Sequence, residues 1–146
     1  MTIQAIDVAA CLLNKVDEES GDVITHLKLQ KLLYYCQGTH LALFNTPFFP
    51  ERIEAWQHGP VVPDIYSEFN KFGSNAIPIP ECDKSKFNKE QLDLIDEVYE
   101  VYGQFSAWKL RNLTHDEAPW AENYKPGFNN VISHEDLKNY FLTVLE

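Results

Sequence analysis

Histidine and cysteine are the residue types in this chain that could bind a metal ion or act as a nucleophile. The sequence holds five histidines and three cysteines: His26, His40, His58, His115, His134, Cys11, Cys36 and Cys82. No two histidines have the i, i+4 spacing that a zinc-binding helix uses. The cysteines are odd in number, widely spaced and without a CxxC pair, which indicates neither a zinc ribbon nor a disulfide framework. We therefore expect no metal site, no cofactor and reduced thiols.

A cysteine nucleophile is the main enzymatic alternative. Cys36 could serve if the fold brought His58 or His115 beside it. The spacing places Cys36 on the inward stripe of a predicted helix, where a free cysteine acts as a small, inert hydrophobic residue. The sequence also has no GxGxxG, P-loop or GxSxG motif. These observations favour a protein that is not an enzyme and has no catalytic residues.

Two aromatic, turn-rich segments carry the other candidate site residues. Residues 53–63 (IEAWQHGPVVP) combine Trp56 and His58 with a glycine and two prolines, which indicates a rigid corner. More than fifty residues later, the segment 114–120 contains His115 and Trp120. A neutral histidine can hold a turn by bonding to backbone, and tryptophan is common both in cores and at interface hot spots. Our hypothesis is that the two segments meet in space and line a partner-binding cleft.

Charge limits the partners. The net charge is −10, which disfavours nucleic-acid backbone binding and favours fast encounter with a basic partner or simple solubility. Lys28, Lys31, Lys109 and Arg111 form either a solvated face or a local basic patch. We predict no direct contact with nucleic acid.

Helical periodicity dominates the chain. Apolar spacing, capping residues and proline or glycine stops predict a compact, mainly α bundle of about six helices, with one further short helix near Trp120. The long helices are expected at 3–15, 27–44, 63–72, 89–102, 107–113 and 134–145. Four residues are expected to cap helices: Thr25, Asn88, Ser106 and Ser133.

The helix 27–44 is expected to be central to this bundle. Its inward stripe contains Cys36, His40 and Leu43, with Lys31 and Gln37 on other faces. Gly38 in its middle indicates a close helix neighbour.

A small β-ribbon completes the expected fold. Residues 53–57 suit a short strand, and the sequence Ile77-Pro78-Ile79-Pro80 could lie beside it as an edge. At 146 residues the chain has the length of a single domain, 1–146. The first residues lack the basic start of a signal peptide, and no apolar run reaches the roughly 20 residues of a membrane span. We expect a cytoplasmic protein.

Four segments, in order, carry a resemblance to a known family. They are the block KLQKLLYY at 28–35, IEAW at 53–56, HGPVVP at 58–63 and the residues Thr114-His115 with Pro119-Trp120. With these segments the chain resembles the SocA-like antitoxin family, also called the Panacea domain, from about Ile6 to Leu142.

The resemblance implies a bacterial or phage antitoxin, with a place in phage defence. Such a protein silences a cognate toxin, encoded by the adjacent gene, through direct protein contact, without enzymatic activity, cofactor or membrane. The residues expected to contact the toxin are Trp56, His58, Gly59, Pro60, Tyr66, His115, Trp120, Lys31 and Tyr35.

Three alternatives remain open. The protein could be an adaptor that presents a partner to a protease, or a small-molecule hydrolase that uses Cys36 with a histidine. It could also repress its own gene by binding DNA, against which its net charge argues. The toxin, the stoichiometry and the oligomeric state are left open by the sequence.

Overall fold

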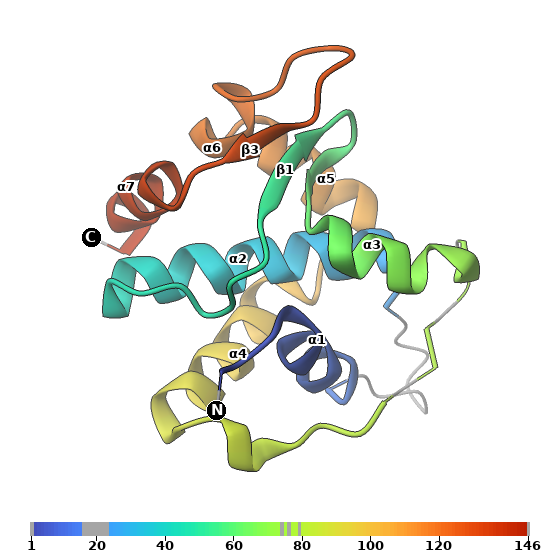
Figure 1. The fold of residues 1–146 in the computed structure, drawn as a ribbon, viewed down its shortest axis with the longest axis vertical. Coiled ribbons are helices and arrows are strands. Elements are labelled where there is room, and N and C mark those ends of the chain that lie inside the picture. Colours follow the sequence, from blue (N-terminus) through green and yellow to red (C-terminus); the bar gives the residue numbers. More distant parts are fainter. Residues whose placement is uncertain (1, 16–23, 74, 76, 79, 146) are drawn as a thin grey trace.

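The computed structural model describes residues 2–15, 24–73, 75, 77–78 and 80–145. Within them the chain forms seven α-helices and a three-stranded sheet, which confirms the mainly α fold (Figure 1). The helices are α1 (Ala5–Leu13), α2 (His26–Phe44), α3 (Pro63–Phe69), α4 (Lys89–Tyr102), α5 (Ala107–His115), α6 (Ala118–Ala121) and α7 (His134–Leu145). The strands are β1 (Ile53–Trp56), β2 (Gly59–Val61) and β3 (Asn130–Ile132). Two short 3₁₀ turns lie at Asn70–Phe72 and Lys84–Lys86.

Helix α2 is the centre of the fold, as predicted. It runs through the middle of the molecule, with α1 and α4 on one side and the sheet, α5 and α7 on the other (Figure 1). The close neighbour expected at Gly38 is α7, because a Cβ there would overlap the ring of the buried Phe141. A glycine at this position therefore lets α7 approach the backbone of α2.

The burial of α2 differs from the sequence prediction. Lys31 and Gln37 were expected on outer faces, yet their side chains are buried, while Leu43 on the predicted stripe is exposed. The reason is that neighbours surround most of the helix, so that its burial does not follow one stripe. Gln37 is satisfied there: its Oε1 accepts from the Phe48 backbone N–H at 2.7 Å and its Nε2 donates to the Phe49 carbonyl at 2.8 Å.

The predicted helix starts are confirmed by their caps. The Thr25 hydroxyl accepts from the Lys28 backbone N–H, and the Ser106 hydroxyl from that of Lys109. The Ser133 hydroxyl accepts from the N–H of Asp136 in the same way. Asn88 and Gln91 form the reciprocal box expected at the start of α4.

The sheet has the strand order β2-β1-β3, and both pairings are antiparallel. β1 and β2 form a hairpin in which Trp56 faces Gly59, while Ile53 pairs with Ile132 of β3. The expectation that residues 77–80 lie beside β1 is wrong, because β2 and β3 occupy its two edges. Of that segment, Ile79 lies outside the described residues.

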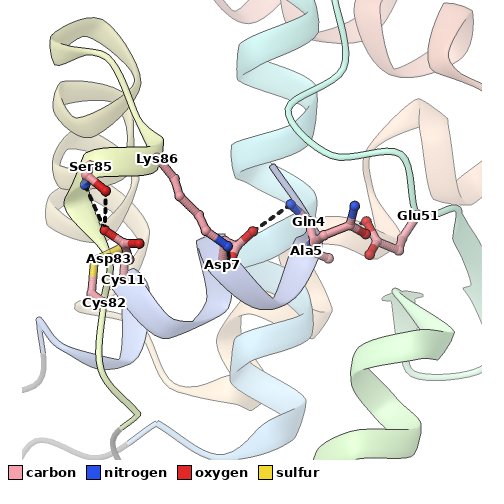
Figure 2. A network of polar contacts seen from close by, with 9 residues as sticks. All are labelled: Gln4, Ala5, Asp7, Cys11, Glu51, Cys82, Asp83, Ser85 and Lys86. Atoms are coloured by element: carbon pink, nitrogen blue, oxygen red, sulfur yellow. Dashed lines mark hydrogen bonds and ion pairs between the residues drawn. A yellow bond between two sulfur atoms is a disulfide. The ribbon is translucent and has the colours of Figure 1, made fainter. Parts of the chain in front are cut away.

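A second correction concerns the cysteines. Cys11 of α1 and Cys82 form a disulfide across 71 residues, so the prediction of three reduced thiols is wrong and only Cys36 is free. Figure 2 shows this bond beside a second tie, the 2.9 Å ion pair from Lys86 to Asp7. Together they fasten α1 to the segment that leads into α4. The wide spacing hid the pair because only the tertiary fold brings the two cysteines together.

None of the helices in the described part of the chain is long and apolar enough to cross a membrane.

Candidate partner-binding cleft

The two segments that were predicted to meet do meet. The Trp120 indole N–H of α6 donates to the Trp56 carbonyl at 2.7 Å, which joins α6 to the hairpin. The His115 ring stacks on Trp120 with centroids 3.8 Å apart, and Trp56 packs edge-on against Tyr66 of α3 at 4.8 Å. Four predicted site residues therefore form one aromatic assembly over α2, with His58 on the adjoining turn.

Within this assembly the two tryptophans are structural supports. Trp56 and Trp120 are only partly exposed, and both indole N–H groups are used inside the protein, because Trp56 donates to Glu54 at 2.9 Å. Their rings fix the position of the hairpin against α3 and α6. The hollow that a partner could enter lies next to them.

This hollow, which we call the Lys31 cleft, has a volume of about 300 Å³. It is lined by Leu27, Lys31, His58, Ala107, Trp108 and Arg111. Trp108 is the most exposed large hydrophobic residue here, with 65% of its surface accessible, and the Arg111 guanidinium lies 4.7 Å from its ring centroid. Arg111 also donates from Nε to His58 Nδ1 at 3.4 Å.

Sequence reasoning missed Trp108 as a site residue. It considered the tryptophans in turn-rich segments, whereas Trp108 lies in the first turn of α5. A signal was available: Trp108 falls off the stripe formed by the buried Leu110 and Thr114, so an outward position could have been expected.

Lys31 is the buried member of the residues that line the cleft. Only 1% of its surface is accessible, and its ammonium nitrogen has no hydrogen-bond partner among the described residues. Burial, together with the smaller effect of the nearby positive charge of Arg111, lowers the pKa of Lys31 to about 7. The basic patch suggested by the sequence therefore contains one lysine that is buried, not solvated.

Gly59 makes room for this lysine. A Cβ at Gly59 would lie 2.8 Å from Lys31 Cε and 3.0 Å from the Thr114 hydroxyl oxygen, and its φ of +115° is unfavourable for other residues. Pro60 is buried and paired with Ala55 in the hairpin. Gly59 thus leaves the space that Lys31 occupies, and neither Gly59 nor Pro60 lines the cleft.

Unsatisfied polar atoms gather around the same place. Four buried side-chain nitrogens of the described residues have no hydrogen-bond partner: His26 Nδ1, Gln30 Nε2, Lys31 Nζ and His115 Nε2. Burial lowers the pKa of His26 and of His115, and the charge of Lys31 acts on both rings in the same direction. Native proteins leave few such atoms unpaired, so the nitrogens of Lys31, His26 and His115, which interact electrostatically, are available to water or to an external group.

One predicted site residue lies elsewhere. Tyr35 is fully buried, and its hydroxyl donates to Glu117 at 2.9 Å, as does that of Tyr34. Burial raises the pKa of Glu117 to about 7, while hydrogen bonds from Tyr34, Tyr35 and Tyr140 act in the opposite direction. We call these four residues the Glu117 cluster. Tyr35 belongs to the interior and does not line the Lys31 cleft.

The comparisons with known proteins place this chain in a family. The family model described as "Antitoxin SocA-like, Panacea domain" matches residues 29–121, well over half of the chain. The protein belongs to this family of antitoxins, which confirms the resemblance seen in the sequence. The matched region contains Lys31, the hairpin, α5 and α6.

Among characterised proteins, the chain is similar to Antitoxin SocA of Caulobacter vibrioides (strain NA1000 / CB15N). The two are 38% identical over 77 residues, which is 52% of this chain and 40% of that protein. The chain thus matches well under half of that relative's length. No solved structure matches.

Proposed function

We propose that this protein is the antitoxin of a toxin–antitoxin pair and that it neutralises its toxin by direct binding at the Lys31 cleft. Membership of an antitoxin family supports the role. The observation that carries the location is the exposed Trp108 beside buried, unpaired donors. Tryptophan and arginine are the residues most enriched among interface hot spots, and here they lie together.

The mechanism that follows is occlusion. A toxin segment that covers Trp108 and enters the cleft would be held by apolar contact with Leu27 and Ala107 and by polar contact with Arg111 and His58. No bond is made or broken, so the antitoxin acts as long as it stays bound. The net charge of −10 would speed the encounter with a basic toxin.

We infer that the protein is not an enzyme. Cys36 is fully buried, and burial raises the pKa of its thiol far above the usual range, so the thiolate that a nucleophile needs is disfavoured. The other two cysteines are bound to each other. These features disfavour the hydrolase alternative on physical grounds.

Co-expression with the product of the adjacent gene tests the role. We expect that product to be toxic alone and harmless with this protein, and to co-purify with it. The proposal is wrong if the product is harmless alone, or if it remains toxic when this protein is present. Shortening of the partner's half-life in the presence of this protein would instead point to the adaptor alternative.

Trp108→Ala tests the location of the binding surface. We expect about a thirtyfold loss of affinity, roughly 2 kcal/mol, because a central anchor is removed. Phe128→Ala is the matched control, since Phe128 is also exposed and also has a cation over its ring, that of Lys125 at 4.9 Å. Equal affinities for Trp108→Ala and the wild type, measured by calorimetry, would place the interface elsewhere.

A further inference from the structure

Among the residues that the structure describes, Lys31 has no anionic partner to balance its charge. The groups that act on its neighbourhood are Arg111 of α5, His26 of its own helix, His58 of the hairpin turn and His115 of α5. All of these are cationic or neutral, and the carboxylate of Asp116, which acts on His115, belongs to an exposed residue. Burying an ammonium without a counterion costs free energy of folding. A binding partner that supplies an anion would offset this cost.

The shape of the cleft limits what that anion can be. Leu27, Ala107 and Trp108 give it apolar walls, and the donors are Lys31 below with Arg111 and His58 beside it. Such a site suits one small, flat acceptor carried on an apolar stem. An extended polyanion is disfavoured because the chain as a whole carries a charge of −10.

We infer that the Lys31 cleft receives the carboxylate of an acidic side chain, aspartate or glutamate, from the toxin. This inference rests on the proposed function and adds the chemistry of the contact. The carboxylate accepts from the Lys31 ammonium and from the Arg111 guanidinium, while apolar atoms next to it cover Trp108. Charge-assisted hydrogen bonds in a site closed to water are strong and geometrically selective.

Selectivity follows from this arrangement. A protein with a net charge of −10 repels acidic surfaces at long range, so a single carboxylate is accepted only where it reaches Lys31. A toxin that lacked the acidic residue at this point would leave the buried ammonium unpaired and would bind weakly.

The test is the affinity of the wild type and of Lys31→Met for the purified toxin. We expect Lys31→Met to weaken binding at least a hundredfold, and the exposed Lys109→Met on α5 to stay within threefold of the wild type. Thermal melts of both variants check that they are folded. Replacing each toxin Asp or Glu by Asn or Gln should reveal one position whose replacement weakens binding as much as Lys31→Met does. Combining that toxin variant with Lys31→Met should weaken binding by less than a further threefold, because both changes remove the same contact.

A pH series gives a second readout. Wild-type affinity should fall roughly tenfold from pH 7.5 to pH 9 as Lys31 loses its proton, and Lys31→Met should show no such fall. His26 and His115 do not account for a change in this range, since burial lowers their pKa values further below it.

Each contrary outcome has a distinct meaning. If the wild type does not bind the toxin, both the proposed function and this inference fail. If the wild type binds and Lys31→Met binds equally, only the inference fails. The side-chain assignment is overturned if removal of the toxin's terminal carboxylate abolishes binding and no toxin Asp or Glu is coupled to Lys31. Competition by inorganic phosphate at millimolar concentration likewise overturns it.

Discussion

The Lys31 cleft and the Glu117 cluster lie one turn apart along α2, and both bury an ionisable group. Around Glu117 the protein supplies the partners, because the tyrosine hydroxyls of α2 and α7 point at the carboxylate. Around Lys31 the described residues supply none, and buried nitrogens of His26 and His115, on which the charge of Lys31 acts, also lack partners. One group is buried in a network that belongs to the fold, and the other is buried facing a cleft.

The contrast teaches which buried charges serve stability and which serve binding. A network with satisfied donors and acceptors holds the helices together, whereas an unpaired ammonium weakens the free protein. A protein that keeps such a group gives up stability at a site that needs an outside partner. The outcome of each of the following three predictions would either support or contradict this difference between the Lys31 cleft and the Glu117 cluster.

The largest expected effect is a gain in stability. Lys31→Met should raise the free energy of unfolding by on the order of 4 kcal/mol at pH 7, because the ammonium no longer has to be desolvated. Urea unfolding measures the change, with the exposed Lys109→Met as control, expected within about 0.5 kcal/mol of the wild type. A destabilised Lys31→Met would show that the lysine has a partner in the free protein.

The opposite sign is expected at the other region. Glu117→Leu should lower the free energy of unfolding by about 3 kcal/mol, because the buried hydroxyls of Tyr34 and Tyr35 lose their acceptor. Urea unfolding at pH 5 is the suitable measurement, since the folded-state carboxyl is then protonated and ionisation of the unfolded chain contributes less than about 1 kcal/mol. Glu117→Gln keeps an acceptor and should lose less than half as much. Equal losses would mean that packing, not hydrogen bonding, is responsible.

The smallest effect is a pair of opposite slopes with pH. The folded pKa of Glu117 is raised from 4.5 to about 7, so its contribution to stability is lost as the pH rises through this range. The folded pKa of Lys31 is lowered from 10.5 to about 7, so stability returns as the pH rises from 7 toward 10. Each limb should have a slope of at most about 1.4 kcal/mol per pH unit, and the free energy of unfolding should be lowest near pH 7.

Unfolding curves from pH 4 to pH 10 measure both slopes. Glu117→Gln should flatten only the acidic limb and Lys31→Met only the alkaline limb. A single variant that flattened both limbs would show that the two groups titrate together and that the regions are not independent.

Much of the framework could be predicted from the sequence because it is set by local rules. Thr25, Ser106 and Ser133 cap the helices they were expected to cap, and Gly38 marks the crossing of another helix. The motif residues around Trp56 and Trp120 could also be expected to meet. These features depend on neighbours in the sequence or on segments already recognised as a set.

The rest depends on contacts between distant residues that no local pattern encodes. Lys31 looks like a surface lysine until Gly59 and Thr114 are placed over it. The partner of β1 on its far edge is β3, which lies more than seventy residues later in the chain. The Cys11–Cys82 disulfide spans a similar separation. In each case the fold, and not the spacing, brings the residues together.

The position of β3 and α7 bears on how this family can be recognised and exchanged between proteins. The family match ends at residue 121, yet β3 covers an edge of the hairpin strand and Phe141 of α7 fills the space above Gly38. A fragment cut to the matched residues would open a strand edge and remove the cover from the central helix. The residues that identify the family are therefore fewer than the residues that build the fold. A domain moved into another protein has to include β3 and α7 as well as the matched residues.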